Sequence, residues 1–199
     1  MSRLAVALEV LRRRPLAWLG RAALVVAGYH GLLLAGAALR LGSWPNYLEV
    51  YPYAANLARI VAHTPSWRDA FIIALGEPWL EVGRRLPEYR NISEWTLTVE
   101  PARLPVIALA ALLVSLFTLL GPGGGRLLAG LGGGAAGLAN AVVGWAVCCG
   151  SSSWAVLLAL LGLDAVAAFA IEPYGPLFTA AGLALLAAAV LLRAGGCRR

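Results

Sequence analysis

The chain alternates between long apolar runs and one stretch rich in polar and aromatic residues. Apolar residues dominate 16–41, 104–120 and, after a glycine-rich break, most of 127–192. A helix needs about 20 apolar residues to cross a bilayer, and Ala22 to Leu41 supplies such a run. The hydrophobic pattern therefore predicts an all-α integral membrane protein with about four transmembrane helices.

The first 41 residues predict a surface helix followed by a membrane span. In residues 1–14, leucines recur at helical spacing beside four arginines, a pattern typical of an amphipathic basic helix on the cytoplasmic membrane surface. Residues 15–41 are the predicted transmembrane helix 1. His30 falls inside this span and would suit haem ligation or a proton relay, but a local hydrogen bond within the helix is the favoured interpretation.

Residues 42–104 differ from the rest in composition. They hold seven of the ten acidic residues, and prolines and aromatic residues recur through them. Because Trp and Tyr favour the headgroup zone, the region predicts a small extracytoplasmic helical domain that hugs the membrane. Its expected elements are helices over Tyr53–Ala62, Pro65–Leu75 (capped by Thr64) and Glu77–Leu86, then a short strand over Trp95–Val99.

The arginine positions decide how the second half crosses the membrane. Residues 105–136 predict transmembrane helix 2 and a glycine-rich turn, and the 45 residues from 127 to 171 then carry one charge, Asp164. This stretch could cross once or twice. Basic residues belong in the cytoplasm, so the basic C-terminal tail favours one crossing near Gly137–Gly162, a fourth span over Leu177–Leu192, and both termini inside.

Composition agrees with a multi-pass protein of a bacterial or archaeal cytoplasmic membrane. The chain is 60% hydrophobic and 13% charged with a mean hydropathy of +0.77, whereas soluble domains carry about a quarter charged residues. All sixteen basic residues are arginine, which is typical of a GC-rich coding bias. The net charge of +6 comes from arginines that flank spans, so the expected partner is the lipid bilayer and not nucleic acid.

The most specific chemistry lies in Cys148-Cys149, which a Gly-Ser-Ser-Ser run follows inside an apolar segment. Reactive groups in a membrane-length apolar run are costly and are therefore functional candidates. Two neighbouring sulfurs suit a thiophilic ion, although buried cysteine also acts as a plain small hydrophobe. Three cysteines are too few, and odd in number, for a disulfide framework.

Residues 137–197 resemble the inner-membrane mercuric ion transporters of the MerT type. The similarity lies in Gly137-Leu138-Ala139, the cysteine pair, and the run Glu172-Pro173-Tyr174-Gly175-Pro176-Leu177-Phe178. It implies a helical pair over 137–199 in which Cys148 and Cys149 accept a metal ion and Cys197 passes it on. It also implies a bent outer loop at the Glu-Pro-Tyr-Gly-Pro run, with Glu172 and Tyr174 at the cation entrance.

Three functions remain open from the sequence. The first is a non-enzymatic transporter or relay for Hg(II) or Cu(I), which would meet a periplasmic metal carrier. The second is a non-catalytic structural subunit of a larger respiratory or oxygenase-type membrane complex. The third, an enzyme that passes electrons or disulfides through Cys148-Cys149, is the least favoured, because adjacent cysteines form strained disulfides and no Cys-x-x-Cys motif is present. No resident cofactor is expected beyond a bound Hg or Cu ion.

Overall fold

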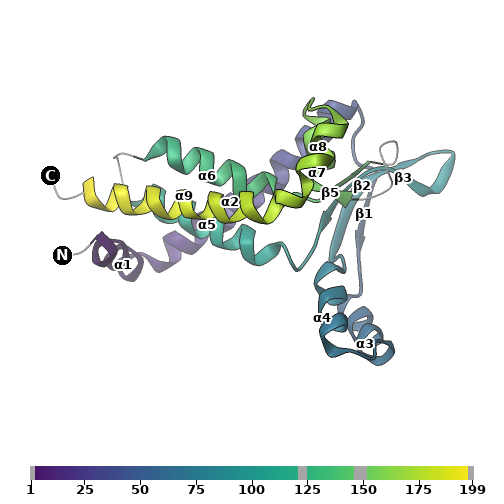
Figure 1. The fold of residues 1–199 in the computed structure, drawn as a ribbon, viewed down its shortest axis with the longest axis horizontal. Helices are drawn as coiled ribbons and strands as arrows, with labels where there is room; N and C mark the ends of the chain where they lie inside the picture. Colours follow the sequence, from purple (N-terminus) through teal and green to yellow (C-terminus); the bar gives the residue numbers. More distant parts are fainter. Residues whose placement is uncertain (1–2, 121–124, 146–151, 197–199) are drawn as a thin grey trace. The chain divides into compact units, whose positions relative to one another are not determined.

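A computed structural model of the chain describes residues 3–120, 125–145 and 152–196. They fall into two compact units, which we treat separately (Figure 1). Unit 1 comprises Met1–Leu32, Val106–Asn140 and Pro173–Arg199, and unit 2 comprises Leu33–Pro105 and Ala141–Glu172.

Unit 1 is helical throughout its described part. Its elements are α1 (Arg3–Arg13), most of α2 (Pro15–Leu41), most of α5 (Leu104–Leu119), α6 (Arg126–Leu138) and α9 (Gly175–Gly196). α6 and α9 run side by side along much of their length (Figure 1). This close approach depends on two glycines: a Cβ on Gly132 would lie 2.6 Å from the carbonyl oxygen of Gly182, and a Cβ on Gly182 would lie 2.6 Å from the amide nitrogen of Ala136. Small residues at the contact allow two helix backbones to approach this closely.

Partly buried hydrogen bonds connect α2 to its neighbours in unit 1. The Trp18 indole donates to the carbonyl oxygen of Leu112 (2.9 Å), and the hydroxyl of Ser115 donates to the carbonyl oxygen of Trp18 (2.7 Å). Tyr29 donates to the carbonyl oxygen of Gly137 at 2.9 Å. These bonds satisfy side-chain groups that would otherwise be costly away from water.

His30 forms the local contact that the sequence favoured. Its Nδ1–H donates to the carbonyl oxygen of Val26, one turn earlier, at 2.9 Å. Its ring also meets that of Tyr29 edge-on, with centroids 4.9 Å apart. The helix-packing interpretation of His30 is therefore confirmed.

Unit 2 contains a five-stranded antiparallel sheet, so the all-α prediction is confirmed only in part: the described chain is mostly helical but includes this small sheet. The strand order is β1 to β5, in chain order. The strands are β1 (Tyr47–Val50), β2 (Leu80–Leu86), β3 (Tyr89–Val99), β4 (Val143–Trp145) and β5 (Ser152–Ser153). The predicted strand over Trp95–Val99 is confirmed as the second half of β3. The predicted helix over Glu77–Leu86 is wrong, because Leu80–Leu86 form β2, which pairs with both β1 and β3.

One face of the sheet is apolar and forms the core of unit 2. Leu97 and Val143 are register partners on this face and pack with Val156 and Leu160 of α7 (Trp154–Leu160). Trp95 is fully buried, and its indole donates to the hydroxyl of Ser43 at 3.0 Å. Since side chains alternate along a strand, the neighbours of these residues are directed to the opposite face.

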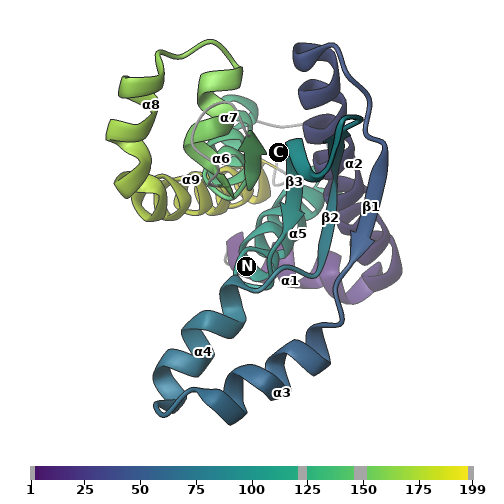
Figure 2. The same ribbon diagram turned by 90° about the vertical axis from the view of Figure 1, so that its right-hand side faces the viewer.

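Two short helices, α3 (Tyr53–His63) and α4 (Trp67–Gly76), connect β1 to β2 in the chain and lie beyond one end of these strands (Figure 2). α3 confirms the helix predicted over Tyr53–Ala62. α4 begins two residues later than predicted because Ser66, and not Thr64, caps it: the Ser66 hydroxyl accepts from the amide of Asp69. Contacts from α3 hold the two helices together, since Tyr53 donates to the carbonyl oxygen of Ala74 at 3.0 Å.

Two helical stretches of the described residues are long and apolar enough to cross a membrane: Pro15–Leu41 and Ala165–Gly195. They contain the first and fourth predicted spans, and only 17% and 28% of their most apolar windows are buried. α5 covers the second predicted span and is apolar but shorter. The third span, expected near Gly137–Gly162, is wrong as a helix, because α6 ends at Leu138 and the strands β4 and β5 follow.

Candidate functional site

The three predicted metal ligands lie outside the described residues. Cys148 and Cys149 fall in the chain segment between β4 and β5, and Cys197 follows α9. The flanking strands are described: β4 and β5 pair antiparallel, with Val143 opposite Ser153 and Gly144 opposite Ser152. The segment with the cysteine pair therefore starts and ends on neighbouring strands of the sheet in unit 2.

The structure brings Glu172 close to the residues that follow the cysteine segment. The Trp154 indole, at the start of α7, donates to the carbonyl oxygen of Glu172 at 3.2 Å. Glu172 itself ends α8 (Ala165–Ile171), a helix that Asp164 caps by accepting from the amide of Ala167 at 3.1 Å. Through Trp154, the sheet and the end of α8 are linked within unit 2.

The loop predicted at Glu172–Pro176 is instead a helical turn. Residues Glu172–Tyr174 form the 3-10 helix η1, and α9 begins at Gly175. Pro173 and Pro176 fit because the first residues of a helical turn need no amide hydrogen bond. Tyr174 is exposed, and the role of Glu172 and Tyr174 at a cation entrance stays a prediction.

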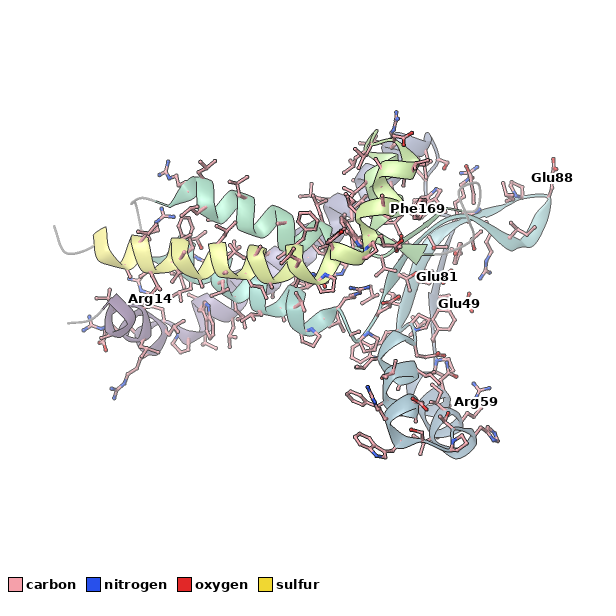
Figure 3. The ribbon with its side chains drawn as sticks, viewed as in Figure 1. Arg14, Glu49, Arg59, Glu81, Glu88 and Phe169 are labelled. Atoms are coloured by element: carbon pink, nitrogen blue, oxygen red, sulfur yellow. The ribbon has the colours of Figure 1, made fainter. Side chains whose placement is uncertain are left out.

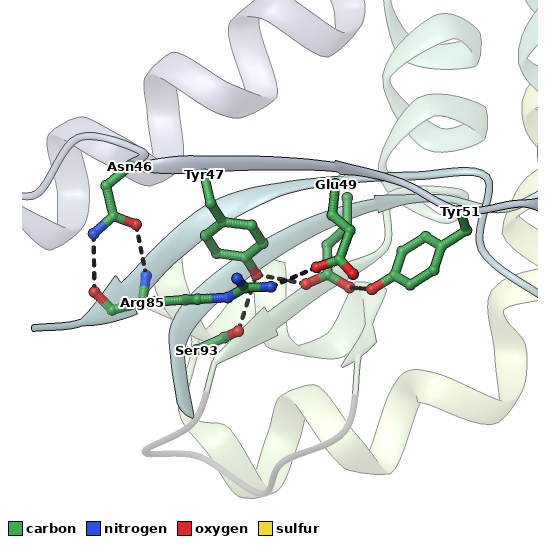
Figure 4. Close-up of polar contacts among 7 residues, drawn as sticks. Asn46, Tyr47, Glu49, Tyr51, Arg85 and Ser93 are labelled. Atoms are coloured by element: carbon green, nitrogen blue, oxygen red, sulfur yellow. Dashed lines mark hydrogen bonds and ion pairs between the residues drawn. The ribbon is translucent and has the colours of Figure 1, made fainter. Parts of the chain in front are cut away.

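A polar cluster that the sequence analysis missed lies on the face of the sheet opposite the apolar core. We call it the tyrosine–glutamate cluster. Figure 3 shows Glu49 and Glu81 close together on this sheet, and Figure 4 shows the contacts around them. The members are Asn46, Tyr47, Glu49, Tyr51, Glu81, Arg85 and Ser93.

Glu81 is held by two phenols. Tyr47 donates to its Oε1 at 2.5 Å, and Tyr51 donates to its Oε2 at 3.0 Å. Because the Tyr47 proton is directed to Glu81, the hydroxyl of Ser93 donates to the Tyr47 oxygen, at 2.9 Å. Both oxygens of the Glu81 carboxylate are thus occupied by neutral donors.

Arg85 neutralises the second carboxylate of the cluster. Glu49 lies directly opposite Glu81 in the β1–β2 register, an arrangement of like charges that is unfavourable by itself. The Arg85 guanidinium forms an ion pair with Glu49 and stacks 4.2 Å from the centroid of the Tyr47 ring. Asn46 fixes Arg85 by accepting from its amide (2.8 Å) and donating to its carbonyl oxygen (3.0 Å).

The environment keeps both phenols protonated. Burial, together with the hydrogen bond to Glu81, raises the pKa of Tyr51 to about 12 and raises the pKa of Tyr47 further above its ordinary value of 10.0. A depression of about 270 Å³, lined by Asn46, Tyr47, Arg85, Leu86 and Pro87, borders the cluster. In this cluster two protonated phenols donate hydrogen bonds to the Glu81 carboxylate, and Arg85 pairs with Glu49. Both carboxylates of the cluster therefore have a partner.

The sequence contained a signal for this cluster. Tyr47-Leu48-Glu49-Val50-Tyr51 alternates polar and apolar residues, the period of a strand with two different faces. Pro45 and Pro52 flank this run, and no element was predicted over it from the sequence. The pairing of Glu49 with Glu81 could not be read from the sequence, since it depends on the register of two strands thirty residues apart.

The described residues thus define a mostly helical chain with two helices able to cross a membrane and a small antiparallel sheet. No group of three or more His, Cys, Asp or Glu side chains among the described residues is arranged to hold a metal ion. Comparison of the chain with protein-family models, curated proteins and solved structures found no match.

Proposed function

We propose that this protein is a non-enzymatic membrane transporter or relay for a thiophilic metal ion, Hg(II) or Cu(I). Cys148 and Cys149 are the proposed acceptor pair and Cys197 the onward ligand. The observation that supports the proposal best is the position of the pair between β4 and β5, two strands with a defined register. Because β4 and β5 are paired, the residues that precede the two cysteines in the chain lie next to the residues that follow them.

The proposed membrane topology keeps four crossings but moves the third. α2 and α9 are the two long crossings, and the shorter apolar helices α5 (16 residues) and α6 (13 residues) are proposed to complete the other two together with the apolar residues that flank them. The arginines at 12–14, 126 and 193 lie at one end of these helices. The positive-inside rule then assigns the ends of unit 1 that carry these arginines to the cytoplasm. By chain order, unit 2 and its cysteine segment are extracytoplasmic, and Cys197 is cytoplasmic.

This topology gives each thiol a separate task. Cys148 and Cys149 take the ion from a carrier outside, and Cys197 receives it inside. Thiolates bind soft ions, and binding releases the thiol protons, so each new metal–sulfur bond to this chain replaces one to the carrier and no redox step is needed. Ion affinity should rise with pH because the ligands must lose their protons.

Metal binding by the purified full chain tests the proposal. Native mass spectrometry with one equivalent of Hg(II) and an excess of a competing small thiol should show one ion retained by the parent, whereas the Cys148→Ser/Cys149→Ser variant, left with Cys197 alone, should lose the ion to the competitor. Cys197→Ser should retain capture but slow release into an acceptor thiol. If the double serine variant binds the ion as well as the parent does, the proposed relay is wrong.

A second function, that of a structural subunit in a larger membrane complex, is favoured by one feature of unit 2. The α3–α4 pair exposes large apolar side chains, with Trp67 83% exposed and Phe71, Ile72 and Ile73 also at the surface. The edge strand β1 likewise exposes Leu48 and Val50. Exposed large apolar side chains gathered on one element in this way are typical of a contact with protein or membrane.

Gentle extraction from the native membrane tests this second function. A structural subunit would co-purify with a fixed set of membrane chains, and Trp67→Ser together with Phe71→Ser would release them. A relay would purify alone and still bind metal. Retention of the partner chains by the double variant would contradict a docking role for the α3–α4 pair.

A further inference from the structure

The charge of the chain is divided unequally between the two units. Within the bounds of unit 1 the sequence places nine arginines and one acidic residue, Glu9. Unit 2 has seven arginines and nine acidic residues, so the units carry net charges of +8 and −2, which add to the +6 of the chain. Glu9 is already paired with Arg13, at 2.6 Å. Unit 1 therefore has a large excess of positive charge.

Several of these cations gather where α5 ends. Arg21 of α2 donates to the hydroxyl of Thr118 at 3.4 Å, and the guanidinium carbon of Arg193 lies 3.9 Å from the centroid of the neighbouring Phe117 ring. Arg126 begins the next helix, α6, whose preceding residue Gly125 is close to the backbone of Ala189 in α9. The last turn of α5 is thus flanked by arginines from α2 and α9.

α1 completes this end of unit 1. Its Ala7 is buried and belongs to one apolar cluster with Phe117, Leu120, Val190 and Ala194. The opposite face of α1 carries Arg12 and Arg13, both exposed, and Arg14 follows directly after the helix (Figure 3). α1 is therefore an amphipathic helix fixed beside the C-terminal part of α9, with its basic side outward.

Arg193 is the one guanidinium of this group that is buried. It is 6% exposed, and its Nε has no hydrogen-bond partner among the described residues. Arg84 and Arg103 in unit 2 also have a buried Nε without a hydrogen bond, but each lies near a carboxylate: Glu94 at 3.0 Å and Glu100 at 3.6 Å. Unit 1 offers Arg193 no such side chain. A buried charge that lacks a counter-ion is unfavourable, and an anion bound from outside would relieve it.

We propose that this end of unit 1 binds the phosphate of an anionic lipid headgroup, with Arg193 as the buried ligand and Arg21 as a second, exposed contact. The planar guanidinium matches a phosphate in geometry and charge. The lipid source follows from α1 and α2: one is an amphipathic basic helix, the other is long and apolar enough to span a bilayer. Anionic headgroups on the cytoplasmic face attract such basic segments.

Native mass spectrometry of the full chain in detergent, with phosphatidylglycerol or phosphatidylcholine added, tests the site. We expect the parent to retain phosphatidylglycerol in preference to phosphatidylcholine. Arg193→Gln should lower the retained phosphatidylglycerol about fivefold, the loss expected for one cationic contact near an anionic surface. Arg68→Gln, an exposed arginine on α4 of unit 2, is the matched control and should leave retention unchanged.

Two further measurements test the same site independently. Arg21→Gln removes an exposed contact and should weaken retention of phosphatidylglycerol without unfolding the protein. This variant tests the site even if Arg193→Gln does not fold. Adding inorganic phosphate alone separates the two sources of the anion: a lipid site should release little phosphatidylglycerol to it. Equal retention of both lipids, unchanged retention in Arg193→Gln and Arg21→Gln, or full displacement by inorganic phosphate would each overturn the proposal.

Discussion

At the scale of single residues, Gly83 allows β2 to pack closely against β3 and the Tyr47 hydroxyl. It lies opposite Tyr47 in the β1–β2 register. A Cβ at this position would lie 2.3 Å from the carbonyl oxygen of Trp95 and 3.1 Å from the Tyr47 hydroxyl. The first of these contacts is with backbone, which cannot move aside without disturbing the ladder.

Replacing Gly83 by alanine should therefore destabilise unit 2 by about 1–3 kcal/mol, the usual cost of overpacking a well-packed site. Chemical denaturation followed by tryptophan fluorescence measures the effect, since Trp95 lies beside the substituted position. Gly76→Ala is the matched control, because a Cβ there meets nothing within 4 Å. Equal stability of the two variants would show that β2 and β3 are not packed as described.

The phenols predict a loss of stability in alkali. In the unfolded chain Tyr51 ionises near its ordinary pKa of 10.0, whereas its folded pKa is raised to about 12. The contribution of Tyr51 to the free energy of unfolding is complete below pH 10. It is lost as the pH rises from 10 toward 12, because in this range the unfolded state releases the Tyr51 proton more readily than the folded state does. Alkaline unfolding, followed by circular dichroism, should show this loss. In Tyr51→Phe the slope over this range should be smaller, and an unchanged slope would contradict the bond to Glu81.

At the scale of elements, the sequence predicted helices well where an apolar run or a clear cap specified them. The helices over residues 15–41 and 53–62 were found, and α5 and α9 contain two other expected spans. The helix predicted over Glu77–Leu86 was wrong. This segment becomes a strand because it pairs with β1 and β3, and that pairing has no local signal in the sequence. The turn at Glu172–Tyr174 was missed because prolines fit the first residues of a helical turn as well as a loop.

The contact between α6 and α9 gives a prediction at this scale. Gly132→Ala should separate the helices, since its Cβ would lie 2.6 Å from the carbonyl oxygen of Gly182, and should cost about 1–3 kcal/mol. Gly134→Ala, on the same helix, meets nothing within 4 Å and should be neutral or stabilising by up to about 1 kcal/mol. Thermal unfolding in detergent compares the two. A greater loss from Gly134→Ala would contradict the described packing face.

At the scale of the whole molecule, the sequence predicted membrane-length apolar helices but not the division into two units. The third span was misplaced because the apolar residues between 139 and 160 suit a buried strand as well as a membrane helix. Val143 is fully buried in the sheet, paired with Leu97 of a strand more than forty residues earlier. Such a long-range pairing leaves no local signal, so hydropathy alone could not distinguish a strand of unit 2 from part of a span.

The proposed relay requires the cysteine pair and Cys197 to lie on opposite sides of the membrane. Labelling of single-site variants in intact spheroplasts, with a maleimide that cannot cross membranes, measures this directly. Cys197→Ser keeps the pair, and Cys148→Ser/Cys149→Ser keeps Cys197, so each variant reports one site. We predict that the pair reacts from outside in intact spheroplasts, whereas Cys197 reacts only after the membrane is opened. Labelling of both sites from the same side would contradict the relay.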